Sequence, residues 1–267
     1  MKIFNVVAAI AIAIASVGVN ADQTSRRLIV GGESVIEGQF NYTVGIRAYA
    51  NGRSNCGGVL IHEFLVLTSV GCATNVSKEL QPRFAAINQK IVDGTDSKTG
   101  EVIEVKRVIF HPMYDDNKVT NEIALLVLEN KSRIKPAKLG SDPKPGSKVW
   151  AFGWGRTDSS HDYPSRTLQR VQLEVKANDL CDMYEMLTAT NLCVGGEEGK
   201  DVCNNDYGGP LIAEGADKNS NDDDRVVGII GLGSGNYGEG CAIGVPSLST
   251  RTSFALNWIN EVINSLK

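Results

Sequence analysis

The chain has 267 residues, 42% of them hydrophobic, with 27 Lys and Arg against 31 Asp and Glu and six cysteines. This length suits one all-β unit or two packed half-domains. The formal net charge of -4 and the lack of a basic cluster argue against binding to nucleic acid or to an anionic membrane surface.

Residues 1–21 have the pattern of a secretory signal peptide. Lys2 supplies the positive start, an apolar run extends from Val6 to Val19, and the small residue Ala21 fits a cleavage site. This run is too short to span a bilayer, and no later run approaches the required length of about 18 residues. We therefore expect a secreted, extracellular protein with no membrane segment. Residues 22–28 are expected to form a short pro-like segment after the signal peptide.

Short runs rich in Val and Ile, separated by Gly, Asn, Asp and Pro, predict many short antiparallel strands. Examples are residues 42–48, 101–110, 147–155 and 225–233. The Pro- and Gly-rich segment 141–147 predicts a linker between two halves. Apolar residues between Phe254 and Leu266 recur at helical spacing, and they predict a C-terminal helix with one face packed on the β-structure.

Residues 213–224, with the sequence AEGADKNSNDDD, are polar and charged. Such a composition has little to bury and predicts a solvated surface loop. The alternative is an acidic loop that contacts a partner. Asp93, Asp96, Glu101 and Glu104 could in principle hold calcium, but their spacing is not diagnostic, and we expect no metal and no cofactor.

Six cysteines in an exported chain suggest three disulfides, and their spacing alone leaves every connectivity open. A zinc site is not indicated, because there is no CxxC pair and no neighbouring histidine. Three N-glycosylation sequons, at Asn41, Asn75 and Asn130, are candidates for modification.

Seven sequence runs occur in the order typical of trypsin-like serine proteases. They are IVGG (29–32), CGGVLI (56–61), VLTSVGC (66–72), NEIALLVL (121–128), GWG (153–155), DVCNNDYGGPL (201–211) and NWI (257–259). The chain resembles this family from residue 29 to about residue 266.

The resemblance implies an all-β fold of two packed antiparallel six-stranded β-barrels with a C-terminal helix. The trypsin-like domain would cover 29–267, with the N-terminal barrel at about 29–140 and the C-terminal barrel and helix at about 147–267. The resemblance also implies three disulfides, and these are Cys56–Cys72, Cys181–Cys193 and Cys203–Cys241.

The three positions that carry the family's catalytic side chains hold other residues here. Gly71 stands in place of the histidine, Glu122 in place of the aspartate and Tyr207 in place of the serine. Acyl transfer by this triad needs a base, a nucleophile and a carboxylate that orients the base. Gly71 supplies no base, the phenol of Tyr207 has an ordinary pKa of about 10, and Asn205 replaces a glycine of the oxyanion hole. We therefore expect no catalytic residue and no peptidase activity.

No histidine occupies the catalytic position. His62, His111 and His161 lie elsewhere in the sequence. Each is expected to be a solvated or hydrogen-bonded side chain.

The remnant of a specificity pocket is also altered. Asp201 matches the acid at the base of a trypsin pocket, which would favour Lys or Arg. However, Leu232 replaces the pocket-edge tryptophan and Ser247 replaces a wall glycine. We expect a relic acid in a narrowed pocket.

Zymogens of the family are activated by cleavage before IVGG, and the new amino terminus then pairs with an aspartate, here Asp206. The pair Arg26 and Arg27 offers a processing site, but Leu28 intervenes before Ile29. Cleavage after Arg27 would leave the amino terminus one residue too long.

A narrower resemblance rests on the run CVGGEEGKDVC (193–203), the altered triad and the acidic, exported character. Together these look like the glucanase inhibitor proteins exported by microbial plant pathogens. That resemblance implies a catalytically inactive protein that binds a secreted host endo-β-1,3-glucanase in the apoplast and suppresses glucan-elicited defence. The alternatives are a non-catalytic homologue that binds another extracellular protein or a glycan, and a weak serine protease with a displaced base.

Overall fold

The computed structural model describes residues 30–74, 83–94, 100–118, 120–156, 164–185, 187–217, 220–233 and 241–266. The expected signal peptide and pro-like segment, Ile29, Asn75, Asp96 and His161 lie outside these ranges. Within the ranges, no helix is both long and apolar enough to cross a membrane.

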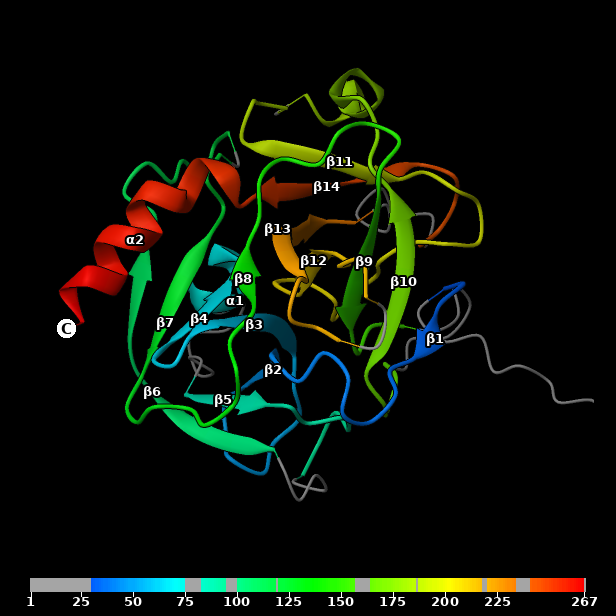
Figure 1. The fold of residues 1–267 in the computed structure, drawn as a ribbon. Coiled ribbons are helices and arrows are strands. Elements are labelled where there is room, and N and C mark those ends of the chain that lie inside the picture. Colours follow the sequence, from blue (N-terminus) through cyan, green and yellow to red (C-terminus); the bar gives the residue numbers. More distant parts are fainter. Residues whose placement is uncertain are drawn as a thin grey trace, which may run out of the picture.

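The first half of the chain forms a closed six-stranded barrel, in the order β2-β3-β4-β7-β6-β5 (Figure 1). The strands are β2 (Thr43–Arg47), β3 (Cys56–His62), β4 (Leu65–Thr68), β5 (Phe84–Ile87), β6 (Glu101–Phe110) and β7 (Ala124–Leu128). β4 and β7 are buried along their whole length, as apolar strands should be. β2 is buried along its whole length too, although it includes Thr43 and Arg47. β6 is the most exposed strand of this barrel, and its pairing with β7 shifts in register between Val105 and Arg107.

The second half forms an eight-stranded sheet in the order β1-β10-β9-β12-β13-β14-β11, with β8 paired to β13. The strands are β1 (Glu33–Ser34), β8 (Lys138–Leu139), β9 (Lys148–Gly153), β10 (Gln169–Glu174), β11 (Asn191–Gly195), β12 (Pro210–Ala213), β13 (Arg225–Leu232) and β14 (Pro246–Arg251). A bridge between Val175 and Val194 joins the β10 side to β11, so the six strands β9 to β14 curl into the second barrel. The expected all-β architecture is confirmed, and two short strands, β1 and β8, are added to the second sheet.

The C-terminal helix α2 (Leu256–Ser265) follows the short 3-10 helix η3 (Ser253–Ala255). It lies beside β6 and β7 in Figure 1. Ile259 and Val262 are buried in the core that the first barrel builds, and Trp258 meets His111 edge to face at 4.9 Å between ring centroids. The helix therefore ties the end of the chain to the N-terminal barrel.

Three disulfides cross-link the fold, and they join the pairs that the resemblance implied. They are Cys56–Cys72, Cys181–Cys193 and Cys203–Cys241. The first joins β3 to the short helix α1 (Val70–Thr74), the second joins the 3-10 helix η1 (Asn178–Tyr184) to β11, and the third lies beside the remnant pocket.

The expectation of a fully solvated acidic loop at 213–224 is wrong in its last residues. Asp224 is buried, with 1% of its surface exposed, and accepts a hydrogen bond of 2.7 Å from the Tyr42 hydroxyl of the first barrel. The side chain of Asn221 donates to the same carboxylate, and Asp222 pairs with Lys135. Some of the polar residues of this loop therefore bind polar groups of the first half of the chain. The composition of the loop does not reveal these contacts.

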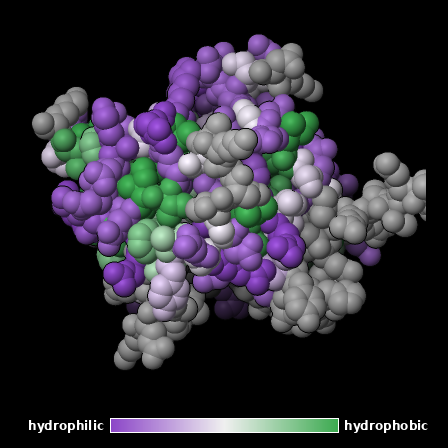
Figure 2. Space-filling view, turned by 90° about the horizontal axis from the view of Figure 1, so that it is seen from below, coloured by the Kyte–Doolittle hydropathy of each residue, from purple (hydrophilic) through white to green (hydrophobic). Residues whose placement is uncertain are grey.

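The surface is mainly hydrophilic on the face seen from below (Figure 2), where apolar residues form separate small patches. Among the described residues, the large apolar side chains that are exposed are spread over several elements and loops, and only Leu180 and Met183 share one element, η1. They are Ile36, Tyr49, Phe110, Met113, Leu180, Met183 and Phe254. Exposed apolar residues scattered in this way are normal and do not by themselves mark an interface.

Candidate functional site

The fold brings the three altered triad positions together between the two barrels. Gly71 lies in α1, directly after β4, while Glu122 immediately precedes the buried start of β7. The amide of Gly71 donates a hydrogen bond of 2.9 Å to Glu122 Oε1. Tyr207 reaches the same region from the second half of the chain, because its carbonyl accepts a hydrogen bond of 2.7 Å from the Gly57 amide of β3.

The close approach of the two halves at this point requires glycine. A side-chain carbon placed on Gly57 would lie 2.6 Å from the Cα of Gly209, which is shorter than any real contact of this kind. The segment that carries Tyr207 is thereby held against β3. The two halves of the chain therefore stay in close contact at the position that we expect to match the nucleophile.

Space does not explain the glycine at position 71. A Cβ built on Gly71 would lie 3.5 Å from Glu122 Oε1 and 3.9 Å from Ser69 Oγ, and both are ordinary contacts. A side chain could therefore begin at this position. The base is missing because the sequence lacks it and not because the Cβ would clash.

Glu122 has a carboxylate at the position that we expect to match the aspartate of the triad, and its pKa is raised. Burial raises the pKa of Glu122 to about 7, and Asp116 adds to the rise, although hydrogen bonds from the amides of Gly71 and Val70 oppose it. With glycine at position 71, this carboxylate holds two backbone amides of α1 and has no imidazole to orient. The sequence analysis did not predict that Glu122 binds backbone amides of α1. No sequence signal marks such a contact, because backbone amides occur along the whole chain.

The two described histidines are engaged away from the triad. The Nδ1 atom of His62, at the end of β3, accepts a hydrogen bond of 3.3 Å from the amide of Phe64. The Nδ1 atom of His111, which is buried after β6, accepts one of 3.2 Å from the amide of Met113. Burial also lowers the pKa of His111. Neither ring is placed as a base for Tyr207 by these contacts.

The backbone of the former oxyanion loop keeps a left-handed residue. Asn205 has a φ of 73°, a conformation that favours glycine and that Asn tolerates better than most residues. The turn thus survives the loss of glycine. Asn205 adds a side chain at this position. In active members of the family, the backbone amide at this position faces the oxyanion of the reaction.

The acid of the remnant pocket is closed off. Asp201 has 1% of its surface exposed, and the hydroxyl of Ser247 lies 2.8 Å from each of its carboxylate oxygens. The amide of Val202 donates a further hydrogen bond of 2.8 Å to Asp201 Oδ1. Ser247 therefore satisfies the carboxylate that a Lys or Arg side chain of a ligand would otherwise contact.

Asp206 is fully buried behind the nucleophile loop. Its carboxylate accepts hydrogen bonds from the amides of Gly155, at 2.7 Å, and Cys203, at 2.9 Å. Burial raises the pKa of Asp206 to about 7 against the effect of these two amides, and Asp201 adds to the rise. A side chain on Gly155 would overlap this carboxylate, which explains the glycine at the end of the GWG run.

Of the candidate calcium ligands, Asp93, Glu101 and Glu104 lie among the described residues. Among the described residues, no group of three His, Cys, Asp or Glu side chains could hold a metal ion. Glu101 is instead engaged by Ser132 and Arg133.

Comparisons with known proteins agree with this geometry. A sequence model of the Trypsin family matches residues 29–259. The chain is 40% identical to glucanase inhibitor protein 2 of Phytophthora sojae, over 99% of this chain and 89% of that protein. It is 36% identical to glucanase inhibitor protein 3 of Phytophthora infestans, over 98% of each chain.

Among solved structures, neuropsin, a serine protease of mouse brain, superimposes with a TM-score of 0.72. The match covers 87% of this chain and 98% of that chain at 24% identity, so it speaks for the fold alone. With the sequence matches above, the fold and the order of its motifs lead to one conclusion: the chain belongs to the trypsin family.

Proposed function

We propose that the protein is an exported, catalytically inactive member of the trypsin family that binds and inhibits a host endo-β-1,3-glucanase and so suppresses glucan-elicited plant defence. The observation that carries this proposal is the loss of base and nucleophile, at Gly71 and Tyr207, from a scaffold that is otherwise kept. The target follows from the relatives named glucanase inhibitor proteins, at 36 to 40% identity over nearly the whole chain.

The chemistry of the site supports inactivity. Loss of a single serine or histidine from such a triad costs on the order of a millionfold in kcat. Here both are replaced, and the phenol of Tyr207 has no imidazole beside it at Gly71. Glu122, with a pKa of about 7, is half-protonated near neutral pH, yet its Oε1 atom is committed to the Gly71 amide.

A scaffold without this chemistry acts by occupying its target. Inhibition should be stoichiometric and reversible, because no acyl-enzyme can form without a nucleophile. A stable complex should bury about 1,200 to 2,000 Å² of surface in total. Because Ser247 covers Asp201, we expect the contact to depend on surfaces other than a basic side chain inserted into the old pocket.

The experiment is a titration of laminarin hydrolysis by several purified plant endo-β-1,3-glucanases, alongside gel filtration of each mixture. The proposal predicts loss of hydrolysis that saturates near one equivalent, with co-elution of the two proteins. Protein whose three disulfides have been reduced and alkylated serves as the control and should not inhibit. Failure to inhibit or bind any glucanase would refute the proposed target, and a pull-down from apoplastic fluid would then identify the partner.

The same proposal places the mature protein outside the cell. Three disulfides fit an oxidising compartment. Amino-terminal sequencing of protein from the culture medium should begin after Ala21. A mature chain that retains the apolar run from Val6 to Val19 would contradict export through a cleaved signal peptide.

A further inference from the structure

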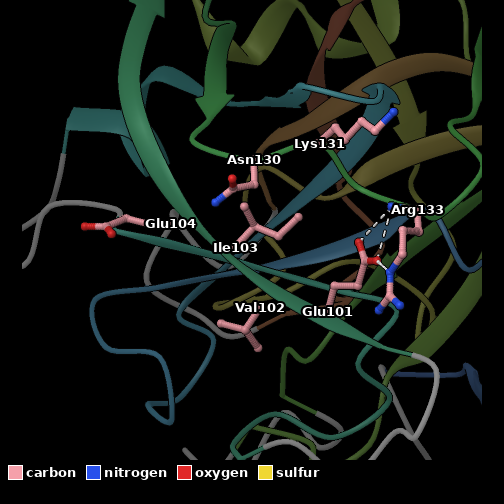
Figure 3. Close-up of a pocket in the computed structure, with 7 residues that line it drawn as sticks. All are labelled: Glu101, Val102, Ile103, Glu104, Asn130, Lys131 and Arg133. Atoms are coloured by element: carbon pink, nitrogen blue, oxygen red, sulfur yellow. Dashed lines mark hydrogen bonds and ion pairs between the residues drawn. The ribbon is translucent and has the colours of Figure 1, made fainter.

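A shallow hollow of about 360 Å³ lies on the surface of the first barrel (Figure 3). Residues 101–104 of β6 line one side, and the loop after β7 lines the other with Asn130, Lys131 and Arg133. This volume is at the lower end of the range for ligand sites. None of its lining residues belongs to the altered triad or to the remnant pocket.

The loop beside the hollow is fixed in place by Glu101. Ser132 Oγ donates a hydrogen bond of 2.6 Å to its Oε2 atom, and Arg133 Nε donates one of 2.7 Å to its Oε1 atom. Burial alone would raise the pKa of Glu101, but these hydrogen bonds outweigh it and hold the pKa below its usual range. The amide of Glu129 also donates to the carbonyl of Glu104, at 2.9 Å. The loop is therefore anchored on both sides of residue 130.

Asn130 lies at the exposed tip of this anchored loop. Figure 3 shows its carboxamide over the same hollow as Ile103, whereas Lys131 and Glu104 point away from the centre. Asn130, Lys131 and Ser132 form an N-glycosylation sequon. A sugar joined to Asn130 Nδ2 would begin at the rim of the hollow, beside the partly exposed side chain of Ile103.

The sequon at Asn41 has a different setting. Asn41 is only partly exposed, and its amide oxygen is buried without a hydrogen-bond partner. It stands between two core residues, Phe40 and Tyr42, and the hydroxyl of its sequon residue Thr43 is buried against the carbonyl of Phe40. A sugar on this carboxamide would have to leave a turn that is packed on both sides.

We propose that Asn130 carries an N-linked glycan whose first N-acetylglucosamine lies in the hollow against Ile103, and that Asn41 is unmodified. The apolar face of the sugar ring contacts the aliphatic side chain of Ile103, which lies on the Asn130 side of β6 (Figure 3). Its hydroxyl and acetamide groups meet the charged rim that Glu101 and Arg133 provide. The proposal depends on export of the chain and not on the identity of its target.

The donor is a lipid-linked oligosaccharide diphosphate of the secretory pathway. The C1–Nδ2 bond to Asn130 forms, the C1–O bond to the diphosphate breaks, and Nδ2 loses a proton. Ser132 is 5% exposed in the folded protein, and its hydroxyl is bound to Glu101. Transfer therefore precedes folding of this loop, and the folded structure decides only whether the product is accommodated.

Occupancy is measured on protein secreted from a eukaryotic host. The glycan is removed by peptide N-glycosidase in oxygen-18 water, which converts an occupied Asn into labelled Asp, and chymotryptic peptides are then mapped. We expect the label at Asn130 and none at Asn41. An unlabelled Asn130, or a labelled Asn41, would overturn the proposal.

Variants provide a second readout. In an Asn75→Gln background, which removes the third sequon, Asn130→Gln removes the acceptor without disturbing the hydrogen bond between Ser132 and Glu101, and it should abolish the glycan-dependent mass shift. Asn41→Gln should leave that shift unchanged, because Asn41 is unmodified. Asn117→Gln is the matched control and should also leave it unchanged, because Asn117 is an exposed asparagine outside any sequon. Circular dichroism of each variant establishes that it is folded. A shift that persists in the Asn75→Gln, Asn130→Gln double variant would refute the assignment.

Placement of the first sugar is tested after trimming the glycan to one N-acetylglucosamine. Nuclear Overhauser contacts are expected between the ring protons on the apolar face of the sugar and the methyl groups of Ile103. Occupancy at Asn130 without any such contact would refute the placement in the hollow.

Discussion

The buried carboxylate of Asp206 should make the uncleaved protein more stable in acid than at neutral pH. Burial raises its pKa from an ordinary 3.8 to about 7. A shift of roughly 3 pKa units corresponds to about 4 kcal/mol. Because the folded state holds the proton more tightly, this contribution is complete below about pH 4 and is lost as the pH rises through 7.

The assay is urea unfolding of the chain that starts at Asp22, at about pH 4.5, 6 and 8. Glu122 acts in the same direction, since its pKa is raised from 4.5 to about 7. We expect the free energy of unfolding to fall by several kcal/mol across this range. Asp206→Asn should flatten the profile between pH 4.5 and 8 by about 3 kcal/mol, since part of the contribution is already lost at pH 4.5. Glu122→Gln is the matched variant for the second carboxylate.

Asp206→Asn should also lower stability at acid pH. The NH2 group of the new carboxamide is a hydrogen-bond donor, and it would face the donor amide of either Gly155 or Cys203. Both amides now donate to the carboxylate. A chain that begins at Ile29 should show a different profile, because its ammonium group would lower the pKa of Asp206 if the two pair. Equal pH profiles for the wild type and Asp206→Asn would refute the reasoning.

Three further changes have defined outcomes. Tyr207→Ser alone should leave hydrolysis of Lys and Arg peptide substrates at the level of the blank, because no base adjoins the position; turnover blocked by a serine-protease inhibitor would contradict this. Ser247→Gly should uncover Asp201 and raise the affinity for benzamidine about 10- to 100-fold, as one or two charge-assisted hydrogen bonds would, and calorimetry that finds no gain would show that the pocket is closed by something else. Tyr42→Phe should cost about 1 to 3 kcal/mol in urea unfolding, because it leaves the buried Asp224 without its hydroxyl donor; a change near zero would mean that water replaces the donor.

Much of the fold was predictable because its signals are local or belong to ordered motifs. Strand β6 has the bounds that its Val- and Ile-rich sequence predicted, and α2 follows the apolar spacing of its residues. The positions of Gly71, Glu122 and Tyr207 followed from the runs around them. The structure then placed the three in one region between the barrels.

The remaining features depend on contacts between distant residues. Tyr42 and Asp224 are separated by 182 positions, so nothing near the acidic loop indicates that its last carboxylate is buried. The elevated pKa of Glu122 arises from burial, with a smaller contribution from Asp116, and sequence composition reports neither. The substitution at Ser247 was visible in the sequence, but its hydrogen bonds to Asp201 required the geometry.

The central claim is that a protease scaffold inhibits a glucanase by occupancy and without chemistry. The most direct measurement follows laminarin hydrolysis in an inhibited mixture before and after extensive dilution, with the intact mass of the glucanase recorded at both stages. The account predicts full recovery of hydrolysis and an unchanged glucanase mass. Permanent loss of activity, accompanied by cleavage or a covalent adduct of the glucanase, would contradict it.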